Sequence, residues 1–203
     1  PHNLGEVIDA VDHLLANPEA TPDDLMQFVK GPDFPTGALI MGRQGILDAF
    51  RTGRGSIKLR GRAEIEDGPR GDYIVITELP YQVSPNQFMV KVKELVDNRE
   101  LEGIAELNDE SAKGQMRLVL RLKRDATAMV ILNNLSKRTP LQTNFSVNTV
   151  ALVDGVPRTL NLRDALVAYV DHQLEVLTRR SQYRLDEAQR RAHIVEGLIK
   201  ALD

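Results

Sequence analysis

The chain has 203 residues, of which 42% are hydrophobic and 27% charged, enough for one large or two small soluble domains with a buried core. Aromatic residues make up only 4% and tryptophan is absent, which argues against a single-strand binder built on aromatic stacking. The absence of cysteine excludes a disulfide framework, a thiolate zinc site and a cysteine nucleophile, and no apolar run approaches the roughly 20 residues that span a bilayer.

Two helices are predicted at the start of the chain. Asn3 is the expected N-cap of the first, with Glu6 three residues later as in a capping box. The sequence Thr21-Pro-Asp-Asp24 is typical of a second, short helix, with threonine as the cap and acids near the positive end of the helix dipole. The first helix should cover residues 4–16, where apolar side chains recur at helical spacing: Leu4, Val7, Val11, Leu14 and Leu15.

Strands and helices are mixed in the middle of the chain. Helices are expected at 43–51, 85–98 and 125–136, with Ser84 and Asp125 as caps of the last two. Because the elements do not alternate regularly, we predict an α+β fold with a mainly antiparallel sheet and flanking helices. The strands of this sheet are expected at 36–41, 56–66, 72–79, 103–107, 116–123 and 147–153.

A basic segment, residues 51–62, contains five cations and no acid in a chain whose net charge is -3. Strand alternation would place Lys58, Arg60 and Arg62 on one exposed face, with the apolar residues Ile57, Leu59, Ala63 and Ile65 on the other. The glycines at 53 and 55 would allow a tight turn or a close approach to a partner. Such a row suits closely spaced negative charges, above all a phosphate backbone; the alternative is an ordinary solvated sheet face.

The last part of the chain, residues 161–203, predicts one long helix capped by Asn161. At 1.5 Å per residue this helix would be about 60 Å long, more than a small domain can cover, so we expect a protruding coiled-coil arm. The alternative is a core helix of a compact domain. The second helix of the coiled coil would have to come from the first helix of this chain or from a second molecule. The heptad seam consists of Leu185, Ala188, Ala192, Val195, Ile199 and Leu202.

No pattern of conventional catalysis or metal binding is present. The isolated positions of His2, His13, His172 and His193 lack metal-ligand spacing, and residues 108–111 are more typical of a polar turn than of a cation site. No serine lies in a nucleophile elbow, and no tyrosine lies beside an activating cluster. We therefore expect no catalytic residue and no metal site in this chain.

Six motifs in order carry a resemblance over essentially the whole chain. Together they resemble the A subunit of bacterial DNA gyrase, a type IIA topoisomerase; the corresponding subunit of topoisomerase IV shares the first three and remains the alternative. The fourth and fifth motifs are more similar to gyrase. The motifs are Pro1-His-Asn-Leu4, Gly31-Pro-Asp-Phe-Pro-Thr36, Arg51-Thr-Gly-Arg-Gly-Ser56, Thr77-Glu-Leu-Pro-Tyr-Gln-Val83, Leu132-Asn-Asn-Leu135 and Arg191-Ala-His-Ile-Val-Glu-Gly-Leu198.

The resemblance implies a division into three parts. Residues 1–18 would be the helix that leads out of a winged-helix domain, residues 19–160 the α+β tower domain, and residues 161–203 the start of the coiled-coil arm. Because Pro1 rather than methionine comes first, we expect the chain to be a piece of a longer protein. The family's catalytic tyrosine lies in the winged-helix domain, so this piece alone should be inactive.

The resemblance also implies a set of DNA contacts. Ile8 matches the isoleucine that the family inserts between base pairs, an apolar wedge that kinks the duplex; the alternative is a core residue at the helix edge. The tower flank of the bent DNA would lie on the basic segment, where phosphate contacts position the duplex without reading its sequence. The expected contacts there are Arg51, Arg54, Lys58, Arg60 and Arg62.

The implied partners are double-stranded DNA, the gyrase B subunit, and a second A subunit in an A2B2 assembly, with no membrane. Mg²⁺ and ATP would be held by the B subunit, and this chain would bind no cofactor. A cytoplasmic location follows from the family. The competing interpretation from another class is a non-catalytic interaction or scaffold module, and a stand-alone enzyme acting on an acidic small substrate has little support.

Overall fold

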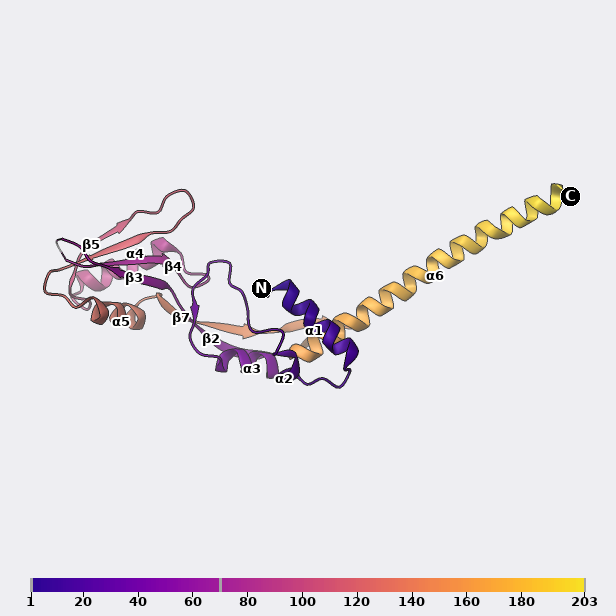
Figure 1. Cartoon of the computed structure of the whole chain (residues 1–203), viewed down its shortest axis with the longest axis horizontal. Helices are drawn as coiled ribbons and strands as arrows, with labels where there is room; N and C mark the ends of the chain where they lie inside the picture. Colours follow the sequence, from indigo (N-terminus) through magenta and orange to yellow (C-terminus); the bar gives the residue numbers. More distant parts are fainter. Residues whose placement is uncertain (1, 70, 203) are drawn as a thin grey trace.

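The computed structural model describes residues 2–69 and 71–202 and has the predicted α+β class, with three antiparallel sheets and a long C-terminal helix (Figure 1). The helices are α1 Leu4–Ala16, α2 Pro22–Leu25, α3 Gln44–Thr52, α4 Pro85–Asp97, α5 Ala128–Arg138 and α6 Leu162–Leu202. The strands are β1 Leu39–Ile40, β2 Arg54–Arg60, β3 Arg62–Glu66, β4 Tyr73–Glu78, β5 Ile104–Asp109, β6 Leu118–Leu122, β7 Gln142–Asn148, β8 Val150–Val153 and β9 Val156–Thr159.

The helix starts follow from local capping chemistry. The Asn3 side chain accepts hydrogen bonds from the backbone N–H groups of Gly5 (2.9 Å) and Glu6 (3.3 Å), so the predicted cap is confirmed. The capping box is wrong, because Glu6 Oε2 instead accepts from the backbone N–H of Lys30 at 3.2 Å. Thr21 does form a capping box, with Asp24 as its partner.

A four-stranded sheet in the order β3-β4-β6-β5 lies at the end of the molecule opposite to the tip of α6 (Figure 1). Its apolar face carries the cross-strand pairs Ile74 with Leu120 and Ile76 with Leu118, all fully buried. Helices α4 and α5 contribute to the same core cluster, for example through Phe88. Helix α5 begins at residue 128 with Thr127 as its N-cap, so the predicted start at Asp125 is wrong; residues 123–126 form a turn instead.

A second, three-stranded sheet in the order β1-β2-β7 packs against α3. Gly53 ends α3 with φ 77°, a left-handed conformation that favours glycine. Gly55 lies so close to the helix that a Cβ on it would collide with Gly45 and Ala49. The close approach predicted for this glycine is therefore an approach to α3, and it brings Ile57 into the core.

The predicted strand over residues 56–66 is in fact two strands in different sheets. Gly61 separates β2 from β3 and donates its N–H to the carbonyl of Leu141 at 2.7 Å. A Cβ on Gly61 would lie 2.6 Å from the carbonyl oxygen of Glu78, so the chain crosses between sheets where only glycine fits. Arg62 consequently belongs to the four-stranded sheet, whereas Lys58 and Arg60 belong to the three-stranded one.

The region after α5 also differs from the prediction. The strand expected at 147–153 is the end of β7 and the whole of β8, and β8 pairs with β9 in a separate hairpin. The first part of β7, residues 142–146, was not among the predicted strands, although Phe145 and Val147 alternate with polar residues along β7. The strand expected at 36–41 is reduced to the two residues of β1.

The long helix α6 extends far beyond the rest of the molecule (Figure 1). The Asn161 side chain accepts from the backbone N–H of Asp164 at 2.7 Å, so the predicted cap is confirmed. Arg163 anchors the first turn by donating to the backbone carbonyls of Ala20 (2.9 Å) and Pro18 (2.8 Å). Leu166 is the one buried residue of α6 within the described ranges, and the predicted heptad seam beyond it is exposed.

Candidate nucleic-acid interface

The outer face of β2 and β7 carries cations and neutral polar groups. Antiparallel register places Arg54 opposite Asn148, Lys58 opposite Asn144 and Arg60 opposite Gln142, with a pair of serines between them. The intervening residues of β2 point the other way, into the core shared with α3. The eight residues of this face (Arg54, Ser56, Lys58, Arg60, Gln142, Asn144, Ser146 and Asn148) include no carboxylate.

The three cations of this face differ in how they are held. Arg60 is half-buried, and its Nε donates to Oε1 of Gln142 at 2.8 Å, which orients the guanidinium along the sheet. Arg54 and Lys58 are exposed, and within residues 2–69 and 71–202 their side chains form no ion pair. Their charge is therefore available to an anion from outside the chain.

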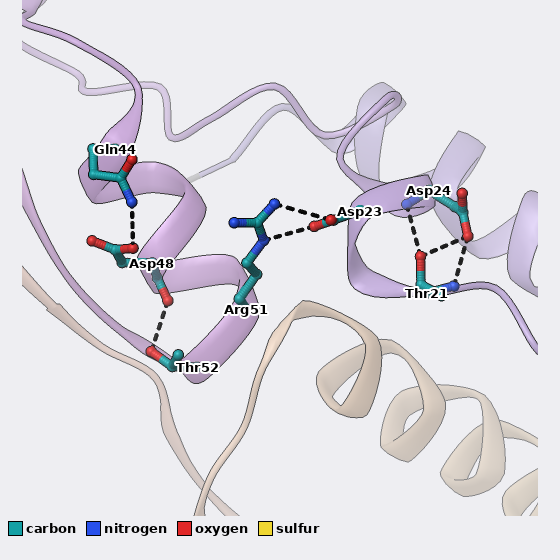
Figure 2. A network of polar contacts seen from close by, with 7 residues as sticks. All are labelled: Thr21, Asp23, Asp24, Gln44, Asp48, Arg51 and Thr52. Atoms are coloured by element: carbon teal, nitrogen blue, oxygen red, sulfur yellow. Dashed lines mark hydrogen bonds and ion pairs between the residues drawn. The ribbon is translucent and has the colours of Figure 1, made fainter.

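Arg51 lies on the last turn of α3, away from this sheet face. Figure 2 shows its guanidinium facing Asp23 of α2, with Nε and Nη2 donating to the two carboxylate oxygens at 2.8 and 2.9 Å. Hydrogen bonding from Arg51 holds the pKa of the Asp23 carboxyl below its usual value, and Asp23 raises the pKa of the guanidinium in turn. Arg51 thus joins α3 to α2, and its predicted contact with DNA stays a prediction.

Arg62 is the other basic residue that lies off this face. It begins β3, and its Nε forms an ion pair with Oε1 of Glu78 at 3.2 Å. Glu78 also accepts the backbone N–H of Ala38 at 2.6 Å. The prediction that Arg62 continues the row of Lys58 and Arg60 is wrong, because the break at Gly61 moves it to another sheet; its DNA contact is still a prediction.

Ile8 lies on the outward side of α1. Its side chain is 49% exposed, and Leu4 (72%) and Leu15 (58%) lie on the same side. Leu4 and Leu15 were predicted to belong to the apolar stripe of this helix, and this is wrong because both are exposed. The buried residues of α1 are Ala10 and Leu14. The half exposure of Ile8 disfavours the alternative that it is a core residue.

One core connects the helix of Ile8 to the basic sheet. Ala10 and Leu14 of α1 belong to the same buried cluster as Phe50 of α3 and Ile57 and Leu59 of β2. Because α1, α3 and β2 share this core, the exposed side of α1 and the outer face of the sheet belong to the same packed part of the structure.

The remaining polar clusters have local explanations. Asp109 accepts the backbone N–H of Ser111 at 2.9 Å, and hydrogen bonding from the side chain and then the backbone of Ser111 lowers the pKa of its carboxyl. Glu110 pairs with Arg117 at 3.2 Å. The polar turn expected at 108–111 is therefore only partly correct: Asn108 and Asp109 are the last residues of β5, and the bond from Ser111 to Asp109 closes a local turn just after the strand. His2 and His13 pack against phenylalanine rings, with centroid distances of 5.6 and 4.8 Å. No group of three or more metal-ligating side chains occurs in the part of the chain that the structure describes.

Sequence reasoning missed the β7 half of this face. The alternation of Asn144, Ser146 and Asn148 with Phe145 and Val147 was the signal that could have found it.

None of the helices in the described ranges is both long and apolar enough to cross a bilayer.

Comparison with known proteins assigns the chain to a family. The model of the DNA gyrase/topoisomerase IV family, for the A subunit of these enzymes, matches residues 1–203. The A subunit of DNA gyrase from Mycolicibacterium smegmatis is 54% identical over 209 residues, covering 100% of this chain and 25% of that protein. Its counterpart in Pseudomonas aeruginosa is 52% identical, with 100% and 22% covered, and that in Streptococcus pneumoniae is 51% identical, with 100% and 25% covered.

The chain therefore spans about a quarter of the length of the curated relatives it matches. The match runs through every element described above, from α1 to α6. The chain belongs to the family of DNA gyrase/topoisomerase IV A subunits.

Proposed function

We propose that this chain is the part of a gyrase A subunit that binds and bends the gate DNA during ATP-dependent passage of one duplex through another. The observation that carries this proposal is the outer face of β2 and β7, where Arg54, Lys58 and Arg60 occur without a carboxylate. Such a face suits sequence-independent contact with phosphates. The gyrase names of the relatives favour gyrase over topoisomerase IV.

The proposal assigns the chemistry to other parts of the assembly. Strand breakage needs a nucleophile, which the family resemblance places in the domain before residue 1. Mg²⁺ and ATP belong to the B subunit, and a second A subunit completes the gate. A cytoplasmic enzyme acting on the chromosome is the setting that this proposal implies.

The isolated chain is expected neither to cleave nor to relax supercoiled DNA, even with the B subunit, ATP and Mg²⁺ present. The reason is that attack on a phosphate needs an activated nucleophile, which the family resemblance places outside this chain. Gel assays of plasmid topology and of covalent DNA–protein adducts would measure this, with duplex binding by the same preparation as the control for folding. Formation of an adduct by the pure chain would contradict the assignment of catalysis elsewhere.

Replacing Arg54, Lys58 and Arg60 by alanine in the assembled enzyme should weaken duplex binding for all sequences alike. Each phosphate neutralised releases about 0.9 counterion, so the slope of log affinity against log salt should become shallower by up to about three. Titrations at several salt concentrations would measure the slope.

The matched control is Lys113→Ala, which removes an exposed cation from the β5–β6 connection of the other sheet. It should leave the salt slope of the enzyme unchanged. If the triple variant also kept the wild-type slope, these residues would not contact phosphate. The face would then be an ordinary solvated one, and the chain a scaffold module.

A further inference from the structure

Beyond Gln142, which accepts a hydrogen bond from Arg60, the outer face of β7 is polar and exposed. Asn144, Ser146 and Asn148 are exposed, while Phe145 and Val147 between them are packed against the core. In the described ranges, 2–69 and 71–202, the three polar side chains take part in no hydrogen bond. Aspartate or glutamate would be equally compatible with an exposed strand face, and neither occurs at these positions.

The register brings these neutral groups next to the cations of β2. Asn144 lies directly opposite Lys58, Ser146 opposite Ser56, and Asn148 opposite Arg54. Side chains directly opposite one another in an antiparallel pair have Cβ atoms about 5 Å apart. A phosphate that reaches the ammonium of Lys58 is consequently within reach of the amide of Asn144, and the same holds at Arg54 and Asn148.

Amide and hydroxyl groups are effective phosphate ligands. Serine and asparagine side chains are regular donors to the sugar–phosphate backbone, alongside arginine and lysine. An aspartate or glutamate in the same positions would repel a phosphate and neutralise the neighbouring cation. The β7 face therefore has the composition expected of a surface on which two adjacent strands, β2 and β7, bind phosphates together.

We propose that β7 is the second half of the DNA-binding surface. Asn144, Ser146 and Asn148 donate hydrogen bonds to phosphate oxygens of the same duplex that Arg54 and Lys58 hold. This inference rests on the proposed function, and it adds residues that carry no charge. Because neutral donors displace no counterions, their contribution to affinity is independent of salt.

The test compares Asn144→Ala/Ser146→Ala/Asn148→Ala with the wild type in the assembled enzyme, using duplex DNA at several salt concentrations. Affinity should fall by about tenfold at every salt concentration, since each neutral hydrogen bond contributes modestly. The slope against log salt should stay at the wild-type value, in contrast to its decrease in the Arg54, Lys58 and Arg60 variant. The control variant, Asn86→Ala/Gln87→Ala/Asn133→Ala, removes three exposed neutral groups from α4 and α5 and should bind normally.

A second variant covers the case in which alanines weaken the strand. Asn144→Val/Asn148→Val removes the same amides but carries β-branched side chains that favour strands, so β7 should persist. It should show a similar salt-independent loss, with its melting temperature and circular dichroism confirming the fold.

The outcomes separate this inference from the proposal on which it rests. Wild-type affinity in the β7 variants, together with a shallower slope in the β2 variant, would overturn the role of β7 and leave DNA binding by the cations intact. A loss of affinity accompanied by a shallower slope would also overturn it, because β7 would then only position the cations. Wild-type binding by both sets of variants would remove the proposed function itself.

Discussion

In the assembled enzyme, replacing Ile8 by alanine is expected to reduce DNA bending sharply and to reduce cleavage with it. The substitution removes an exposed apolar side chain from α1 but leaves the cations of β2 in place. Phosphate contacts dominate affinity, so binding at low salt should fall much less than bending.

The size of the effect follows from the cost of kinking a duplex. Unstacking one base step costs a few kcal/mol, which an inserted wedge offsets. Losing about 2 kcal/mol of that compensation would shift the ratio of bent to straight DNA by roughly 30-fold. If cleavage needs the bent geometry, its rate should decrease in parallel.

Energy transfer between dyes at the two DNA ends would measure the bend, and the covalent adduct would measure cleavage. The matched control is Leu15→Ala, a somewhat more exposed apolar residue on the same side of the same helix, which should bend DNA normally. Normal bending by the Ile8→Ala enzyme, together with a lower melting temperature, would identify Ile8 as a packing residue and rule out the wedge.

The second large effect is expected on folding. Leu120 is 0% exposed and lies in β6, one of the two inner strands of the four-stranded sheet, between Ile74 of β4 and Leu107 of β5. Leu120→Ala removes buried methyl groups and leaves a cavity between two layers that cannot collapse freely. The free energy of unfolding should decrease by about 3 kcal/mol.

Urea unfolding followed by circular dichroism would measure this change on the chain itself. The control, Leu152→Ala, makes the same chemical change at a strand position that is 73% exposed, and it should alter stability by no more than about 0.5 kcal/mol. Equal destabilisation by both variants would show that the four-stranded sheet does not form the core described here.

Local chemistry accounts for the features that could be read directly from the sequence. Four helices start at a predicted cap, because each cap lies at most three residues from the backbone N–H that it binds: Asn3, Thr21, Ser84 and Asn161. The alternation of β2 is equally local. It correctly predicted that Lys58 lies on an exposed face whose opposite side is buried.

The candidate site was predicted only in part. Arg54, Lys58 and Arg60 share one face, but Arg51 lies on a helix and Arg62 in another sheet. Their partners, Asp23 and Glu78, are 28 and 16 residues away in the chain, and no local pattern signals such pairings. The neutral half of the face was overlooked because its only signal is the short alternation of Asn144, Ser146 and Asn148 with Phe145 and Val147, which carries no charge and does not show which strand lies beside it.

The sequence by itself therefore determined the fold class, the N-caps of four helices, the exposed alternation of β2 and the length of α6. Only the tertiary structure decided that the chain changes sheets at Gly61 and that β2 pairs with β7, in which Ile57 lies opposite Phe145. The physical reason is that alternation specifies which side of a strand is buried but not which strand lies beside it. That choice depends on the packing of α1, α3 and the core they share, which involves residues from distant parts of the chain.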